Sequence, residues 1–240
     1  MRRGIKEAMG INYPKGVINY LGLPLFRSRQ KDAYFNFILE NFTSKLQGWK
    51  AKTLSKAGRA TLIKFVGLSM PTYAMQTTKL SSRMVSSIDG LVRDFWWGFQ
   101  KGNRGLHLKA WDKLCLPKSL GGLGFRKTKE MNLAFLAKWG WNLLKGSQSL
   151  CCKILEAKYL NGKDFLSCSY KDSDSWFWKN VVKAKAILRK GACKVVSNGR
   201  AIHIWRDPWI PHYKGFIPKP KGSLLPNVNY VAELLLDNGD

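Results

Sequence analysis

Six basic side chains and one tryptophan lie within a stretch of twenty residues that contains no acid. They are Lys45, Trp49, Lys50, Lys52, Lys56, Arg59 and Lys64. Ammonium and guanidinium groups that share one surface attract polyanions, and an indole among them can stack on a base or a sugar. A helix face that is basic only for solubility normally interleaves Asp and Glu with its Lys and Arg. The stretch therefore predicts a nucleic-acid-binding surface, with internal packing as the alternative for Trp49 and simple solvation as the alternative for the cations.

The charge of the whole chain points to the same class of partner. The 240 residues carry 41 Lys and Arg against 15 Asp and Glu, a net charge of +26, whereas solubility alone needs a charge of about 2 to 8. Nucleic acid is favoured over an acidic membrane because aromatic residues are interleaved with the cations and no segment forms a clean basic amphipathic helix. A hydrophobic content of 45% is enough for a folded core.

Other kinds of functional site find little support in the sequence. The five Cys and three His residues have no zinc-ligand spacing, so we expect no metal and no cofactor. The glycine-rich segment from Lys118 to Arg126 lacks the order of a P-loop and is interpreted as a structural turn. Asp207, which precedes Pro208, is expected to form an Asx-type turn or a bond to backbone. The N-terminus lacks a secretory apolar segment and no run is long enough to span a bilayer, which predicts an intracellular protein with no membrane partner.

The basic stretch is expected to lie on a small helical bundle. Apolar residues recur at helical spacing from Lys31 to Gln47, and Gly48 ends that helix. Ser55 is the expected N-cap of a second helix that Pro71 terminates, and a third helix is expected at about 82–97. Three helices of this length predict a three-helix, thumb-like bundle at 20–100.

The rest of the chain divides into further segments, and the expected fold class is mainly α. A Gly-rich connector is expected at 101–127 and a second helical module at 128–192, with helices at about 130–145, 150–159 and 173–189. Asn198-Gly199 is a strong signal for a type I′ turn, which predicts a small β-hairpin and a DPW turn within 193–211. An N-terminal extension (1–19) and a Pro, Gly and Lys-rich, truncated tail (212–240) complete the division.

Several short motifs resemble, in order and spacing, one region of a known family. They are YLGLP, GWKAKTLSKAGR, LIK, MPTYAM, FWWG, PKSLGGLGFR, LAKWGWNLL, KYL and SNGRAIHIWRDPW. Together with the spacing of Phe35 and Ile38, they resemble the region just after the palm in plant LINE-type (non-LTR) retrotransposon reverse transcriptases. The resemblance covers nearly the whole chain and implies the thumb and the linker that precede a zinc-binding domain.

The resemblance also implies what the chain does. The thumb of such a polymerase grips the backbone of the template-primer, an RNA or RNA–DNA duplex. The family's catalytic Tyr-x-Asp-Asp turn is absent, since no two Asp are adjacent anywhere in the sequence, so the chain is expected to bind nucleic acid and catalyse nothing on its own. The missing palm domain of the same polyprotein is a possible partner, and a nuclear location is implied.

Two other interpretations stay open at this point. The chain could be a decayed retroelement remnant with no selected biochemical role, whose charge is inherited rather than used. It could also be an interaction module that presents its aromatic and helical surfaces to a protein partner. The sequence does not decide between these interpretations, and it does not give the preferred nucleic-acid type or the oligomeric state.

Overall fold

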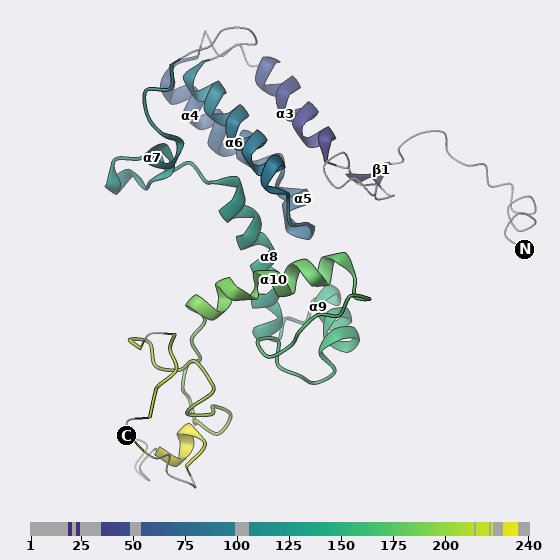
Figure 1. Ribbon diagram of the computed structural model, residues 1–240, viewed down its shortest axis with the longest axis vertical. Helices are drawn as coiled ribbons and strands as arrows, with labels where there is room; N and C mark the ends of the chain where they lie inside the picture. Colours follow the sequence, from purple (N-terminus) through teal and green to yellow (C-terminus); the bar gives the residue numbers. More distant parts are fainter. Residues whose placement is uncertain are drawn as a thin grey trace, which may run out of the picture. The chain divides into compact units, whose positions relative to one another are not determined.

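The structure is a computed structural model that describes residues 19–20, 23–24, 35–48, 54–98, 106–213, 215–220, 222 and 228–234 (Figure 1). These residues are mainly helical, which confirms the expected fold class. The chain divides into two compact units, residues 1–132 and residues 133–240. The six-segment division expected from the sequence stays a prediction.

The first unit contains three longer helices that pack together. They are α3 (Asn36–Gly48), α4 (Lys56–Phe65) and α6 (Ser82–Trp97), and α6 contacts both α3 and α4. A short antiparallel pair, β1 (Asn19–Tyr20) and β2 (Leu23–Pro24), precedes them. Apolar side chains at helical spacing make up the core; they include Phe35, Ile38, Phe42, Ile63, Met84, Ile88, Val92 and Phe95. The three helices expected at these positions are therefore present.

Serine caps begin two of these helices, but α4 ends earlier than expected. The Ser55 and Ser81 hydroxyls accept hydrogen bonds from the backbone N–H groups of Gly58 and Met84. α4 stops at Phe65, and the 3₁₀ turn η2 (Gly67–Ser69) follows. Pro71 is the N-cap of the next helix, α5 (Thr72–Thr77), because proline lacks an N–H but still offers its carbonyl to Met75. Pro71 therefore starts a helix rather than terminating one.

The described part of the expected connector, from residue 106, is ordered around an aromatic cluster. It forms α7 (Trp111–Cys115) and the 3₁₀ turn η3 (Lys118–Leu120). Phe125 is 2% exposed, with its ring centroid 5.8 Å from that of Trp111 and 5.5 Å from that of Trp96. A Cβ atom on Gly122 would lie 1.9 Å from the carbonyl oxygen of Leu116, so only glycine fits there. The interpretation of this glycine-rich segment as a structural turn is confirmed.

The helix α8 (Thr128–Leu144) contributes to both units, and its first turn is tied to the first one. The Asp89 carboxylate accepts hydrogen bonds from the Thr128 backbone N–H (3.1 Å) and hydroxyl (2.6 Å). The Asn132 amide is 2% exposed; its oxygen accepts from the Leu80 N–H, and its nitrogen donates to the carbonyls of Met75 and Thr78. These polar groups are paired, as buried polar groups must be.

The second unit is built on α9 (Leu150–Leu155), the π-helical turn η4 (Glu156–Leu160), α10 (Trp176–Gly191) and the rest of α8. Trp178 is 1% exposed and stacks on the Tyr159 ring at a centroid distance of 4.7 Å. The Tyr159 hydroxyl donates to the hydroxyl of Ser175, the N-cap of α10. The core around Trp178 consists of Leu143, Cys152, Leu155, Leu160, Phe165, Cys168, Val181 and Val182.

The β-hairpin expected within 193–211 is absent from these residues, all of which the structure describes. Asn198-Gly199 does turn, with φ +66° at Gly199, but the following segment pairs with residues 229–232 instead. His203 and Tyr230 form an isolated antiparallel bridge, and the next 3₁₀ turn is η5 (Val231–Leu234). Gly199 packs against the backbone of Ala232, so the turn is used to reach a distant segment.

Candidate nucleic-acid interface

Four of the seven residues predicted to contact nucleic acid are described by the structure. Lys45 is exposed in the last turn of α3, and Lys56, Arg59 and Lys64 lie on α4. Trp49, Lys50 and Lys52 lie outside the described residues. The structure therefore brings three predicted cations onto one helix.

Lys56 and Arg59 point at the C-terminal end of α6. The Lys56 Nζ donates a hydrogen bond to the Trp96 carbonyl oxygen at 3.3 Å, and the Arg59 Nη1 donates to the same oxygen at 3.2 Å. The last carbonyls of a helix have no partner within the helix and carry a partial negative charge. Two cations at this position satisfy one such carbonyl and complement the helix dipole.

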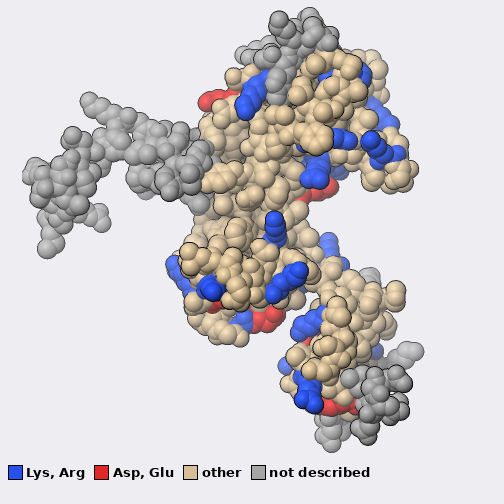
Figure 2. Space-filling model, turned by 180° about the vertical axis from the view of Figure 1, so that it is seen from behind, with Lys and Arg blue, Asp and Glu red and all other residues tan. Residues whose placement is uncertain are grey.

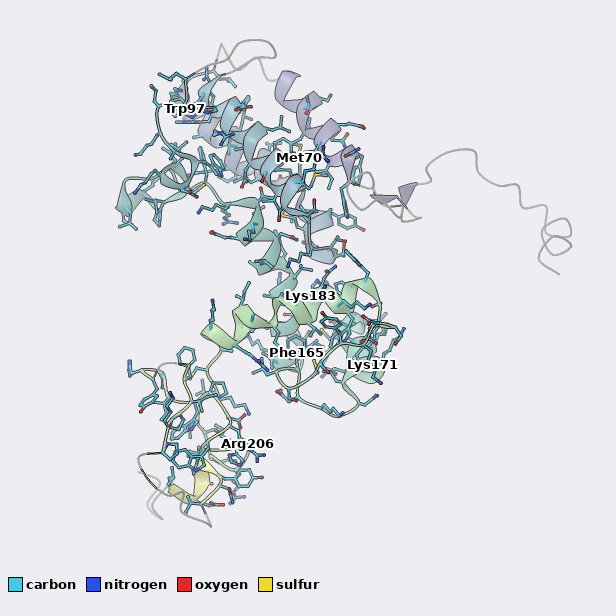
Figure 3. All side chains as sticks on the ribbon, viewed as in Figure 1. Met70, Trp97, Phe165, Lys171, Lys183 and Arg206 are labelled. Carbon is cyan, nitrogen blue, oxygen red and sulfur yellow. The ribbon has the colours of Figure 1, made fainter. Side chains whose placement is uncertain are left out.

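Two tryptophan rings also surround the Lys56 ammonium. Its Nζ lies 4.9 Å from the ring centroid of Trp96 and 4.9 Å from that of Trp97, within the range of cation–π attraction. Figure 3 labels Trp97 at this end of α6. Burial, and secondarily the positive charge of Arg59, lower the pKa of Lys56. The side chain is thus held inside its own unit by an oxygen and two aromatic faces.

Gly98 permits this arrangement. It ends α6 in the left-handed conformation, with φ +78°, and its N–H bonds to the carbonyls of Asp94 and Phe95. A Cβ atom here would lie 2.5 Å from the Arg59 Nη1. Glycine is therefore favoured twice, by the backbone conformation and by the approach of the guanidinium.

The remaining described cations of the predicted set have different surroundings. Lys64 is partly buried, with its Nζ 5.9 Å from the ring centroid of Phe125, and Lys45 is exposed. The Lys64 Nζ also lies 3.9 Å from the position that a Cβ atom on Gly124 would take. The loop that carries Gly124, Phe125 and the exposed Arg126 therefore adjoins α4.

Sequence reasoning missed the cations of this neighbouring segment, because it was interpreted only as a connector. Exposed side chains there with no ion pair to a described carboxylate are Lys113, Lys118, Arg126 and Lys129. Lys127 differs, since it pairs with Asp112 at 2.6 Å and so raises no free charge. The signal that could have found the others is composition: residues 109–129 contain seven Lys and Arg but one acid. Figure 2 shows one face of the molecule on which Lys and Arg greatly outnumber Asp and Glu.

The structure also bears on the other chemistry considered from the sequence. The Asp207 Oδ2 accepts a hydrogen bond from the His203 backbone N–H at 2.8 Å, which confirms its expected bond to backbone. Its Oδ1 pairs with Lys194 at 2.9 Å. Within the described ranges, no three His, Cys, Asp or Glu side chains gather as a metal site would require. Among the same residues, no helix combines the length and apolar character needed to cross a membrane.

Comparison with known proteins gives two plant relatives and no matching family model. The chain is 37% identical over 191 residues to an Arabidopsis thaliana protein named "Putative ribonuclease H protein". That match covers 78% of the chain and 31% of the relative, so the chain spans about a third of that protein. It is also 28% identical over 144 residues to an Arabidopsis thaliana protein named "Uncharacterized mitochondrial protein", covering 60% of the chain and 94% of the relative.

Proposed function

We propose that this chain is part of a plant retroelement-derived protein and that it binds the sugar-phosphate backbone of nucleic acid. The observation that carries the proposal is the charge around α4. Residues 41–88 contain eight Lys and Arg and no Asp or Glu. Evenly basic surfaces of this kind read the shape and charge of a duplex backbone rather than its base sequence.

The geometry refines which cations take part. Lys56 and Arg59 hold the end of α6, so their main contribution is to fix α4 in place. Contact with phosphates falls to Lys45, Lys50, Lys52 and Lys64, with Arg126 beside them. Arginine and lysine at helix ends and in adjoining loops are well suited to backbone contacts, which set position without sequence preference.

The similarities in sequence support the class of parent protein. The motif order resembles the thumb and linker of plant LINE-type reverse transcriptases, and one relative carries the name of a ribonuclease, an enzyme that acts on RNA. We propose that the chain corresponds to a thumb and linker and acts in the nucleus. We also propose that it is not catalytic by itself, because no two Asp are adjacent in its sequence; primer extension by the purified chain with Mg²⁺ and nucleotides would contradict this.

The salt dependence of binding tests the proposal. Each phosphate that a duplex loses as a contact flattens the plot of log K against log salt by about 0.9. Replacing Lys45, Lys50, Lys52 and Lys64 together by Gln is expected to flatten the slope by about three to four units. Fluorescence anisotropy with a labelled RNA–DNA duplex, at several NaCl concentrations, measures this slope.

A second variant controls for net charge. Replacing Arg206, Lys214, Lys219 and Lys221 by Gln removes the same number of cations from the C-terminal part of the chain. This control is expected to bind more weakly through long-range attraction but to keep most of the slope, since direct contacts are retained. Equal flattening in both variants would mean that net charge alone drives binding, and no change in affinity with salt would remove the electrostatic basis of the proposal.

A further inference from the structure

The exposed face of α10 carries a second set of cations, away from the surface predicted from the sequence. The helix contains five Lys and Arg and no acid between Trp176 and Gly191. Lys179, Lys183 and Lys190 follow each other at i, i+4 and i+11, which places them on one stripe of an α-helix over roughly 16 Å. The opposite face is buried, with Trp178, Val181 and Ala184 each at most 1% exposed.

Three of the five α10 cations are used within the protein. Lys185 donates to the Cys168 carbonyl oxygen, and the Arg189 Nη2 donates to that of Leu166 at 2.6 Å. Lys179 donates to the Asp172 carbonyl oxygen and lies 3.8 Å from its carboxylate. These bonds fasten the segment before α10 onto the helix. Lys183 and Lys190 stay exposed, with no ion pair to any carboxylate among the described residues.

The fastened segment sets an aromatic ring beside the free cations. Tyr170 follows Cys168 by two residues and is 39% exposed. The Lys183 Nζ lies 5.4 Å from its ring centroid. Lys171, the next residue, is also exposed, and Figure 3 labels it together with Lys183. An accessible ring is therefore flanked by three unpaired ammonium groups.

We infer that this surface, defined by Tyr170, Lys171, Lys183 and Lys190, binds single-stranded nucleic acid. Ammonium groups neutralise phosphates, and every base offers a face on which a tyrosine ring can stack. In a duplex the base faces are covered by neighbouring bases, so an exposed ring favours a single strand. The inference rests on the proposed nucleic-acid function but concerns a second surface and a different form of the ligand.

Full-length variants test the surface with three labelled probes: oligothymidylate, oligouridylate and an RNA–DNA duplex. Replacing Lys171, Lys183 and Lys190 by Gln is expected to flatten the salt slope for single strands by about two units, at roughly 0.7 per phosphate contact. Tyr170→Leu is expected to weaken single-strand binding about five-fold or more, since stacking on an aromatic side chain contributes that much per base. Tyr170→Phe keeps the ring and should bind as the unchanged chain does. The two single-strand probes show whether DNA or RNA is preferred.

Matched controls separate this surface from net charge and from the α4 surface. Lys138, Lys153 and Lys163 are exposed elsewhere in the same unit, and replacing them by Gln should leave the single-strand slope nearly unchanged. Duplex binding should survive the α10 changes, and single-strand binding should survive the α4 changes. The inference is overturned if the control flattens the slope equally, if Tyr170→Leu binds normally, or if the α10 changes affect only the duplex. Loss of duplex binding on changing α4 tests the proposed function independently.

Discussion

At the scale of single residues, Gly98 links the backbone of α6 to the placement of Arg59. We expect Gly98→Ala to be destabilising for two reasons. An L side chain at φ +78° costs about 1–2 kcal/mol, and the new methyl group would displace the Arg59 guanidinium from the Trp96 carbonyl. Loss of that hydrogen bond adds about 1 kcal/mol. Urea unfolding followed by circular dichroism measures the total.

Gly121 provides the matched control for this prediction. It has nearly the same φ, +74°, but no atom lies within 4 Å of the position its Cβ would take. Gly121→Ala therefore carries the conformational cost alone and should be milder by about 1 kcal/mol. In an Arg59→Ala background the two glycine substitutions should cost the same. A difference that persists in that background would show that Arg59 is not the cause.

At the scale of elements, Asn132 fixes the first turns of α8 to the end of α5. We expect Asn132→Ala to lower the free energy of unfolding by about 2–4 kcal/mol, because it leaves the Leu80 N–H and two carbonyls unpaired in a buried place. The shift of the urea midpoint measures this effect. Lys129→Ala, exposed on the same helix, should change stability by less than about 0.5 kcal/mol. Similar midpoints for the two variants would contradict the assigned role of Asn132.

The elements that the sequence predicted correctly are those with local causes. Ser55 caps α4 because its hydroxyl needs only the N–H three residues on, and Gly48 and Gly98 end helices through their own conformation. The features that the sequence did not predict depend on distant partners. The Asn198-Gly199 turn was read correctly as a turn, but the partner of the following segment lies near Tyr230 and not next to it in the chain.

The same distinction holds for the candidate site. A run of cations without acids is visible in the sequence and predicts a basic surface. Which of those cations stay available depends on α6, since Lys56 and Arg59 bond to a carbonyl 40 and 37 residues away. The α10 surface was missed because its free cations are identified only after Lys179, Lys185 and Arg189 are seen to be bonded internally.

At the scale of the whole molecule, the net charge of +26 means that the folded chain repels itself. Salt shortens the range of that repulsion, since the Debye length falls from about 10 Å at 0.1 M to about 3 Å at 1 M. We therefore expect the urea midpoint to rise between these NaCl concentrations in the absence of nucleic acid. This is the opposite of the effect that salt should have on nucleic-acid binding, where it weakens the complex.

A charge-reduced variant shows whether repulsion is the cause of the salt effect. Replacing the exposed Lys113, Lys138, Lys153 and Lys163 by Gln removes four positive charges and touches neither proposed binding surface. This variant should be more stable than the unchanged chain at 0.1 M NaCl and should gain less from added salt, because less repulsion remains to be screened. If both chains gained equally, salt would be acting through apolar burial rather than charge. If neither gained, the cations would already be neutralised within the fold, and a polyanionic partner would no longer be needed to explain them.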